Sequence, residues 1–380
     1  MSGKRAWMAV VVAAFLIALL SGCGTQAGSD NQGNGEKTIK IGMVGPLTGD
    51  YATYGNSVKN GIQVAIDEVN AQGGVQGYKL QLIAEDSKGD STEAANAVQK
   101  LIDQDRVTAI VGAVLSGETA TAAPIAQDSG VLMITPSATA PGIADIGDFI
   151  FRNVITDDIQ SAQMAEYAVT TLGIKKFGIL YANNDYGVAL KDNFVQRAES
   201  MDAQVIGIES YLDGDEDFRA QLTKLGNDIE GLYIAGYYTE ASKIAQQARR
   251  QGMNAQILGA DGFFSEKLVE LGGDSVEGAY FTAGFYSGDE SEAVRSFVET
   301  YKNAYKSEPD MFAANAYDSM KIVAQALEQS GDDRAKLKDV MATILDYPGI
   351  TGVTSFTESG EALKEVIILR VEGGKFNRAR

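Results

Sequence analysis

The chain has 380 residues, of which 45% are hydrophobic and 22% charged, a composition typical of a globular protein long enough for two domains. Its formal net charge is −19, and the acidic residues are dispersed, so the surface would repel phosphate backbones and we expect no nucleic-acid partner. Histidine is absent and only one cysteine is present, which excludes Ser-His-Asp triads, Cys-His dyads and the usual zinc sites.

The N-terminal segment is typical of a secretory signal. Lys4 and Arg5 precede the apolar stretch AWMAVVVAAFLIALL, which ends at Ser21, Gly22 and Cys23. The stretch is short for a transmembrane helix, although an uncleaved anchor helix is the alternative. LSGC resembles the lipobox of bacterial lipoproteins, in which the cysteine is acylated. We therefore expect a signal peptide at residues 1–22, cleaved before a lipidated Cys23.

The sequence from Cys23 onward predicts a flexible linker, followed by alternating strands and helices. Residues 23–37 are rich in Gly, Ser, Asn and Gln, which is typical of a flexible linker. From there, short apolar runs alternate with segments whose apolar residues recur every three or four positions. The expected strands of this half are 38–44, 79–86, 107–114 and 131–135, with helices between them. This βαβ repetition predicts a mostly parallel sheet with helices on both faces.

The pattern pauses at 148–158 and then begins again. We expect strands at 176–182, 203–210, 230–236 and 255–260, each followed by a helical stretch. After the segment 277–287 come two long helical patterns, at 290–306 and 311–329, and finally a strand-like segment at 365–371. The predicted fold class is therefore α/β, with two doubly wound lobes of mostly parallel sheet.

Polar residues gather where four of these strands end. The segments are GAVLSGET (112–119), TPSAT (135–139), AGYYTE (235–240) and GADG (259–262). In open α/β sheets, ligands bind beyond the carboxyl ends of the strands, and two such units form a cleft between them. We expect these segments to converge on one small polar ligand.

The residue types at these strand ends suit an α-amino acid. Ser116 and Thr139 can donate to a ligand carboxylate at a helix start. Asp261, the main chain at Ser137 and Tyr237 can receive an ammonium group. An apolar side chain would lie against Tyr54, Val114 and Leu115. Each residue also has a plainer role: Ser116 as a helix N-cap, Asp261 as a turn former, and Tyr237 in ordinary packing.

The motifs of common catalytic sites are missing. Ser116 is not in a nucleophile elbow, because Val114 and Glu118 stand where glycines are required. There is no P-loop, and with Cys23 committed to lipid no thiol nucleophile remains. A carboxylate-pair or Ser-Lys hydrolase is compatible with the composition, but we expect no enzyme, no cofactor and no metal site.

Several long segments resemble one family. They include IKIGMVGPLTGDYATYGNSVKNGIQVAIDEVN, VGAVLSGETATAAPIAQDSGVLMITPSATAP, ILYANNDYGVAL, IAGYYTEASKIAQQARRQGM, ILGADGFFS and FAANAYDSMKIVAQAL. These resemble the solute-binding proteins of branched-chain amino acid ABC transporters, from about residue 39 to 371. The resemblance implies a type I periplasmic-binding fold with three crossing segments. Lobe 1 would comprise 38–156 plus 287–366, and lobe 2 would comprise 157–286 plus 367–380.

The resemblance also implies roles for individual residues. Ser116 and Thr139 would bind the ligand carboxylate, while Asp261 and the Ser137 carbonyl would bind its ammonium. Tyrosines from both lobes would cover the ligand, namely Tyr54, Tyr186 and Tyr237. The implied partners are the ABC permease subunits, and the implied location is extracytoplasmic, anchored to the membrane through lipid on Cys23. We expect a monomer.

Two departures from the family pattern affect the site. Asp261 stands where relatives often have the longer Glu, so the ammonium would sit deeper or bind through a water. Glu118 adds a carboxylate close to the proposed carboxylate site. We expect it in the first turn of the helix, pointing to solvent, where it interacts favourably with the helix dipole. The alternatives are another solute, such as an amide, urea or aromatic acid, and a sensory lipoprotein.

Overall fold

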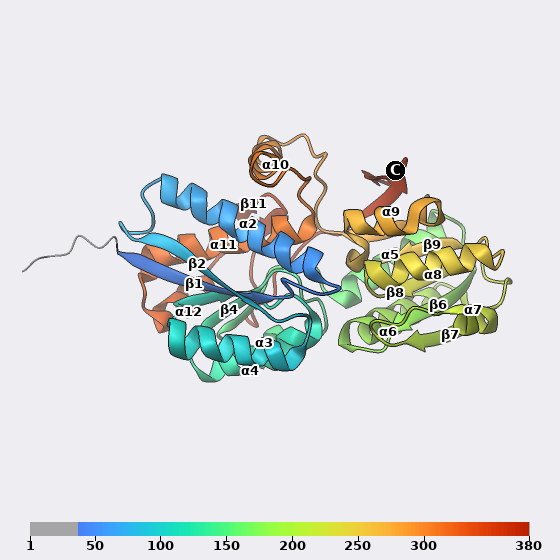
Figure 1. Cartoon of the computed structure of the whole chain (residues 1–380), viewed down its shortest axis with the longest axis horizontal. Coiled ribbons are helices and arrows are strands. Elements are labelled where there is room, and N and C mark those ends of the chain that lie inside the picture. Colours follow the sequence, from blue (N-terminus) through green and yellow to red (C-terminus); the bar gives the residue numbers. More distant parts are fainter. Residues whose placement is uncertain (1–36, 380) are drawn as a thin grey trace, which may run out of the picture. The chain divides into compact units, whose positions relative to one another are not determined.

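A computed structural model describes residues 37–379 (Figure 1). The predicted signal peptide, Cys23 and the linker up to residue 36 lie outside the described residues. In the part of the chain that the structure describes, none of the helices combines the length and the apolar character needed to cross a bilayer.

The first sheet contains the strands of the N-terminal half, all parallel, in the order β2-β1-β3-β4-β5. Its strands are β1 (Thr38–Gly45), β2 (Lys79–Asp86), β3 (Ala109–Val111), β4 (Leu132–Thr135) and β5 (Ile150–Arg152). Alternate residues of β1 face opposite sides: Ile41 and Met43 belong to one apolar cluster and Val44 to another. This alternation requires helices on both faces.

Helices from both ends of the chain cover this sheet. They are α2 (Ala52–Ala71), α3 (Ser91–Lys100) with a π-helical turn (Leu101–Asp105), α4 (Ser116–Asp128), α10 (Glu292–Tyr305), α11 (Met311–Ser330) and α12 (Arg334–Met341). Helix α11 packs along α2, and α3 packs along α4 (Figure 1). The apolar faces of α2 and α11 share the cluster of Ile41, whereas α3 and α4 share that of Val44. The late helices therefore complete the first sheet.

The second sheet has the order β14-β13-β10-β9-β8-β6-β7. Its strands are β6 (Lys176–Ala182), β7 (Gln204–Tyr211), β8 (Gly231–Ala235), β9 (Gln256–Gly259), β10 (Tyr280–Ala283), β13 (Ile367–Glu372) and β14 (Lys375–Arg378). Strand β13 pairs in antiparallel fashion with both β10 and β14, and the other pairs of this sheet are parallel. The C-terminal hairpin thus extends a parallel sheet at one edge.

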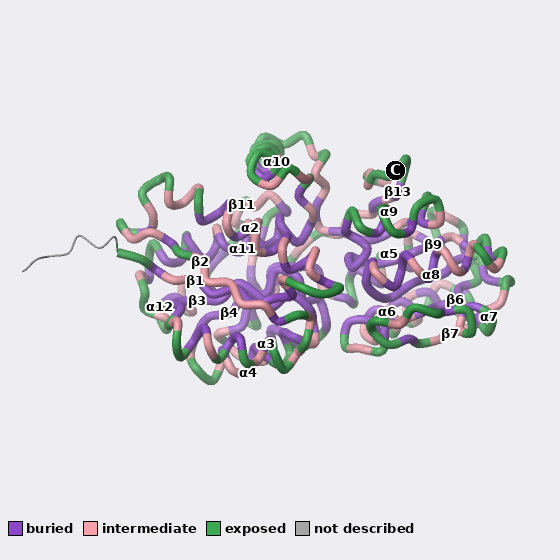
Figure 2. The backbone as a smooth tube through the Cα atoms, in the orientation of Figure 1, coloured by how far each residue is buried: buried purple, intermediate pink, exposed green. Residues whose placement is uncertain are grey.

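Five helices accompany the second sheet, with α5 packed beside α6 and α8 beside α9. They are α5 (Asp157–Thr170), α6 (Asp185–Ser200), α7 (Arg219–Leu225), α8 (Tyr238–Arg250) and α9 (Glu266–Gly272). Phe194 of α6 stacks on Tyr233 of β8, with ring centroids 4.0 Å apart. Figure 2 shows buried residues along the inner strands, and exposed residues along the edge strand β7 and on the outward sides of the helices.

The predicted fold class is confirmed: two mostly parallel, helix-covered sheets are joined by segments after β5, after β10 and before β13. The sequence did not predict β5, β10, β14, helix α12 or a small hairpin of β11 (Tyr347–Gly349) and β12 (Gly352–Thr354). Strand β14 reads KFNR and lacks an apolar run. It is held instead by Phe376, whose ring lies 5.1 Å from that of Phe281.

Candidate functional site

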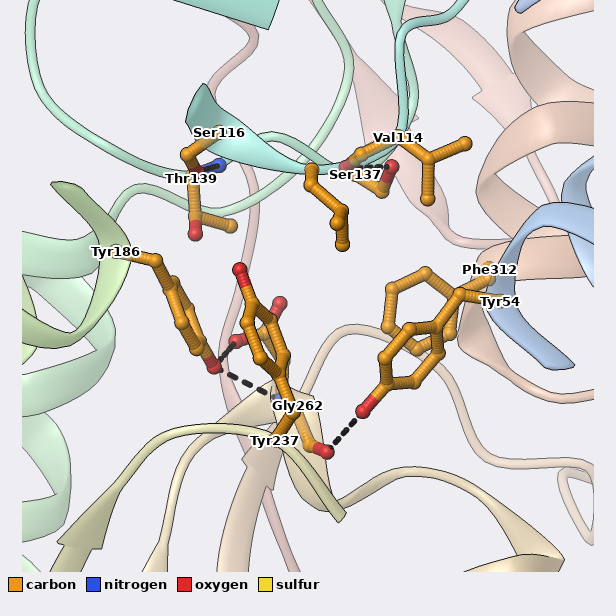
Figure 3. A pocket seen from close by; sticks show the side chains of 11 residues that line it. Tyr54, Val114, Ser116, Ser137, Thr139, Tyr186, Tyr237, Gly262 and Phe312 are labelled. Atoms are coloured by element: carbon orange, nitrogen blue, oxygen red, sulfur yellow. Dashed lines mark hydrogen bonds between the residues drawn. The ribbon is translucent and has the colours of Figure 1, made fainter. Parts of the chain in front are cut away.

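One pocket contains all nine of the cleft residues that the sequence predicted (Figure 3). They are Tyr54, Val114, Leu115, Ser116, Ser137, Thr139, Tyr186, Tyr237 and Asp261. Gly262 and Phe312 also line it and were not predicted. The cavity among these residues has a volume of about 10 Å³, so their side chains nearly fill it. The structure therefore brings the residues together, and their roles toward a ligand remain predictions.

Ser116 is the first residue of α4, but its hydroxyl does not cap that helix; Leu115 occupies the N-cap position. The Ser116 Oγ accepts from the backbone N–H groups of Thr139, at 3.3 Å, and Ala140, at 3.2 Å. The N-cap interpretation of Ser116 is therefore wrong. Because a hydroxyl has two acceptor lone pairs and one proton, these two bonds leave the proton free to point elsewhere.

Ser137 uses its hydroxyl in the opposite way. Its Oγ donates to the carbonyl of Val114 at 2.8 Å, and Thr135 Oγ1 donates to the carbonyl of Ala113, also at 2.8 Å. These bonds tie the segment after β4 to the segment after β3. Since the Ser137 hydroxyl proton is engaged, only acceptors of this residue remain for a ligand, in agreement with its predicted carbonyl role.

Glu118 is buried, with 1% of its surface exposed, so the prediction that it points to solvent is wrong. One carboxylate oxygen accepts from Ser87 Oγ at 2.5 Å, and the other accepts from the backbone N–H of Leu115 at 3.1 Å. Leu115 has no polar side chain, and Glu118 folds back to satisfy an N–H at the helix start. Burial raises the pKa of Glu118 to about 7, against the lowering effect of these hydrogen bonds.

Asp261 begins a short 3₁₀ turn (Asp261–Phe263) after β9 and is 4% exposed. Its Oδ1 accepts from Tyr186 Oη at 2.6 Å and from Gln160 Nε2 at 2.9 Å. The backbone N–H of Asp261 donates to Gln160 Oε1 at 3.2 Å. Burial raises the pKa of Asp261, while the bonds from Tyr186 and Gln160 oppose the rise. The carboxylate is thus fixed by side chains, and Gln160 was not foreseen.

Aromatic rings form the remaining walls. Tyr186 and Tyr237 stack with ring centroids 4.9 Å apart and an interplanar angle of 12°. Tyr54 and Phe312 lie with centroids 4.4 Å apart. Phe312 is the second residue of α11. Its place in the apolar pattern of that helix could have indicated that its side chain is buried. The pocket centre is therefore apolar.

Tyr54 also connects the two sides of the pocket. It belongs to α2, yet its hydroxyl donates to the carbonyl of Gly262 and accepts from the backbone N–H of Tyr238 at 3.3 Å. Tyr238 Oη in turn donates to the carbonyl of Asp50 at 2.8 Å and contacts Thr53 Oγ1 at 3.2 Å. The elements of the two sheets are therefore hydrogen-bonded to each other at one edge of the pocket.

Close backbone approach explains why glycine follows Asp261. A Cβ on Gly262 would lie 2.7 Å from the carbonyl oxygen of Gly236 and 2.8 Å from Tyr186 Oη. A larger residue would displace the hydroxyl that holds Asp261. The second glycine of the GADG segment could therefore have indicated that the backbone at position 262 lies close to other groups of the pocket.

The pocket has donors on the side of the first sheet and a carboxylate on the side of the second. Among residues 37–379, the side chains of Asp, Glu, Cys and His form no group of three or more that could hold a metal ion. The arrangement suits a small molecule with a negative and a positive end.

A model of the periplasmic binding protein family matches residues 38–375. The chain belongs to the periplasmic binding protein family.

Individual members of the periplasmic binding protein family agree with this match. A Leucine-, isoleucine-, valine-, threonine-, and alanine-binding protein of Pseudomonas aeruginosa is 30% identical over 328 residues, covering 85% of this chain and 87% of the relative. The Leu/Ile/Val-binding protein of Escherichia coli is 29% identical over 346 residues, covering 90% and 93%.

Solved structures show the same similarity. The branched-chain amino acid transporter substrate-binding protein LivJ of Streptococcus pneumoniae, in complex with isoleucine, has a TM-score of 0.86 and 35% identity. A leucine-binding protein of Thermotoga maritima has a TM-score of 0.85 and 33% identity. Each comparison covers 90% of this chain and 98% of the other. Because the periplasmic binding protein family consists of solute-binding proteins, the prediction that the chain is not an enzyme is confirmed.

Proposed function

We propose that the protein binds an aliphatic amino acid of the leucine, isoleucine and valine class and delivers it to an ABC permease. The observation that carries this proposal is the polarity of the pocket: Ser116, whose hydroxyl proton is not used in the two bonds that its oxygen accepts, lines one end, and the buried carboxylate of Asp261 lies at the other. An amino acid has a carboxylate for the first and an ammonium for the second.

The lining of the middle of the pocket matches an aliphatic side chain in its chemistry, and opening of the two lobes would make room for it. Val114, Leu115 and Phe312 supply apolar surface between the two polar ends. Burying a leucine-sized side chain there contributes about 1.5–3 kcal/mol. Relatives named for leucine, isoleucine and valine binding support this class of ligand.

Closure of two lobes around the ligand is part of the proposal. We assign residues 38–156 plus 287–366 to lobe 1 and residues 157–286 plus 367–380 to lobe 2. The membership of the two sheets supports this division, because α10 and α11 pack with the first sheet and β13 joins the second. Ligand contacts with both lobes would favour the closed state of the hinge.

The proposed setting is extracytoplasmic. We propose that the signal peptide is removed before Cys23, that lipid on Cys23 anchors the protein to the membrane, and that residues 24–37 are the tether. The LSGC motif and the family support this part of the proposal. The protein would act as a monomer beside its permease.

A panel of the free amino acids tests the proposed ligand. Leucine, isoleucine or valine at a hundred times its Kd should stabilise the folded protein by about 2.7 kcal/mol, measured by thermal unfolding after removal of carried-over ligand. The proposal fails if none of the amino acids shifts the unfolding of protein that is folded and ligand-free.

The Asp261→Asn variant tests how the ligand is held. It should lower leucine affinity about 10- to 100-fold in calorimetry, because the ammonium loses its charged partner. Asp274→Asn is the control, since Asp274 is an exposed acid of the same half of the chain. Equal affinity in the two variants would contradict the assignment of Asp261.

A further inference from the structure

Asp157 is a buried acid to which neither the family resemblance nor the pocket lining assigns a role. It is the first residue of α5, directly after the segment that leaves β5, and its exposed fraction is 0%. Its Oδ1 accepts from Gln160 Nε2 at 2.9 Å. Its Oδ2 is buried and has no hydrogen-bond partner among the described residues. A carboxylate oxygen in this state is costly unless something binds it.

The unpartnered oxygen belongs to a residue that adjoins the acidic end of the pocket. The same Gln160 Nε2 also donates to Asp261 Oδ1 at 2.9 Å, so the two carboxylates are neighbours that share one amide group. The backbone N–H of Asp157 donates to the carbonyl of Thr139 at 3.1 Å. Asp261 and Thr139 both line the pocket. Asp157 is therefore placed directly behind the predicted ammonium site.

Within residues 37–379, no cationic side chain forms an ion pair with either of these two acids. Arg152 is the cation that acts on Asp157, but its guanidinium pairs with Glu361 and donates to the carbonyl of Ala140. Burial raises the pKa of Asp157 well above its ordinary value and the charge of Asp261 raises it further, whereas the nearby Thr139 hydroxyl, Gln160 and Arg152 act to lower it. Two adjacent buried carboxylates require a proton or a cation between them.

We propose that Asp157 is the second carboxylate of the ammonium site and makes it selective for ligands that carry a charged α-amino group. This inference rests on the proposed function and extends it. An ammonium group has three N–H donors. Ser137 and Asp261 line the pocket and offer acceptors to it, and Asp157 adds its negative charge directly behind them. An acid of the same shape without the amino group leaves both carboxylates uncompensated and is rejected.

The test is the Asp157→Asn variant, which keeps the side-chain shape and removes the charge. Calorimetry should show at least a tenfold loss of leucine affinity. The affinity for 4-methylpentanoate, which is leucine without its amino group, should stay the same or rise, measured by competition with leucine. Asp158→Asn is the matched control: Asp158 is an exposed acid of the same helical turn, and its variant should bind leucine as the wild type does.

The outcomes separate this inference from the proposed function. If the wild type binds leucine and Asp157→Asn binds it equally well, the inference fails and the proposed function stands. Equal losses for leucine and 4-methylpentanoate would show a purely structural role and also overturn the inference. If wild-type protein binds no amino acid, the proposed function itself fails. Should Asp157→Asn not fold by circular dichroism, Asp157→Ser, with a short polar side chain at the same helix start, replaces it with the same expected results.

Discussion

The two polar ends of the pocket are built by different means. On the side of the first sheet, Ser116 is fixed by backbone N–H groups of the next strand end, and Ser137 is fixed by a backbone carbonyl. On the side of the second sheet, Asp261 is fixed by the side chains of Tyr186 and Gln160. The geometry of the first end therefore depends on the backbone of the segments that follow two adjacent strands. The geometry of the second end depends on Asp261, Tyr186 and Gln160, which are distant in sequence.

This difference also sets the electrostatic character of each end. Hydrogen bonds from the backbone consume the acceptors of Ser116 and leave a donor, which suits an anion. At the second end the buried carboxylate of Asp261 lies beside that of Asp157, and burial raises the pKa of both although hydrogen bonds oppose the rise, which suits a cation. The protein thus presents opposite polarity to the two ends of one ligand, and single substitutions can test each end.

Replacing Ser116 should have the largest effect of the remaining tests. Ser116→Ala removes the free hydroxyl proton and should lower leucine affinity about 10- to 100-fold, as expected for a hydrogen bond to a charged group. Two backbone N–H groups also lose their acceptor, so thermal stability should fall.

Ser137→Ala is the control for this substitution, because the Ser137 hydroxyl donates only to the Val114 carbonyl. Its leucine affinity, measured by calorimetry, should change less than about threefold. Equal losses in both variants would contradict the distinction between the two serines.

The hydrogen bonds between the two sides should have an intermediate effect. Tyr238 does not line the pocket, but its hydroxyl bonds to Asp50 on the side of α2. Tyr238→Phe should lower leucine affinity about fivefold, the equivalent of about 1 kcal/mol, by disfavouring closure. Small-angle scattering of the ligand-free variant should show a larger radius of gyration.

Tyr305→Phe is the matched control for this substitution. The Tyr305 hydroxyl also contacts a carbonyl, that of Asn60, but both residues accompany the first sheet. Its leucine affinity should equal that of the wild type. An unchanged affinity in Tyr238→Phe as well would show that these bonds do not contribute to closure.

Glu118 should have the smallest effect on binding and a distinct effect on stability. Its folded-state pKa of about 7 lies above the ordinary value of 4.5, so the folded protein binds more protons than the unfolded chain between these values. The contribution of Glu118 to the free energy of unfolding is therefore greatest below pH 4.5 and is lost as pH rises to 7. The loss is up to about 3 kcal/mol.

Glu118→Gln should flatten this dependence while leaving leucine affinity within about threefold of the wild type. The glutamine can accept from Leu115 N–H and donate to Ser87, so both partners stay bonded. Thermal unfolding at pH 4.5 and pH 8 measures the difference. Glu93→Gln is the control, because Glu93 holds the same position in the first turn of α3 and is exposed. An identical pH dependence in Glu118→Gln and the wild type would contradict the raised pKa.

Local patterns in the sequence were sufficient for much of the fold and the pocket. Strands β2 and β6 were predicted at the residues where the structure has them: the edge strand β2 alternates apolar and polar residues, and β6, inside its sheet, is a nearly continuous apolar run. The ends of parallel strands share one edge, which placed Ser116 and Thr139 together, and the expected cleft between two such units added Asp261. Strand β14 escaped because its stability comes from Phe376 packing on rings distant in sequence.

The sequence by itself determined the alternation of strands and helices, the strand-end segments that form the pocket, and the kinds of polar group that they carry. Tertiary structure alone decided that Glu118 folds inward, that Gln160 joins two carboxylates, and that Asp157 is left with an unpartnered oxygen. The physical reason is that periodicity reports which face of an element is buried, whereas the partner of a buried polar group depends on chain segments that only folding brings together.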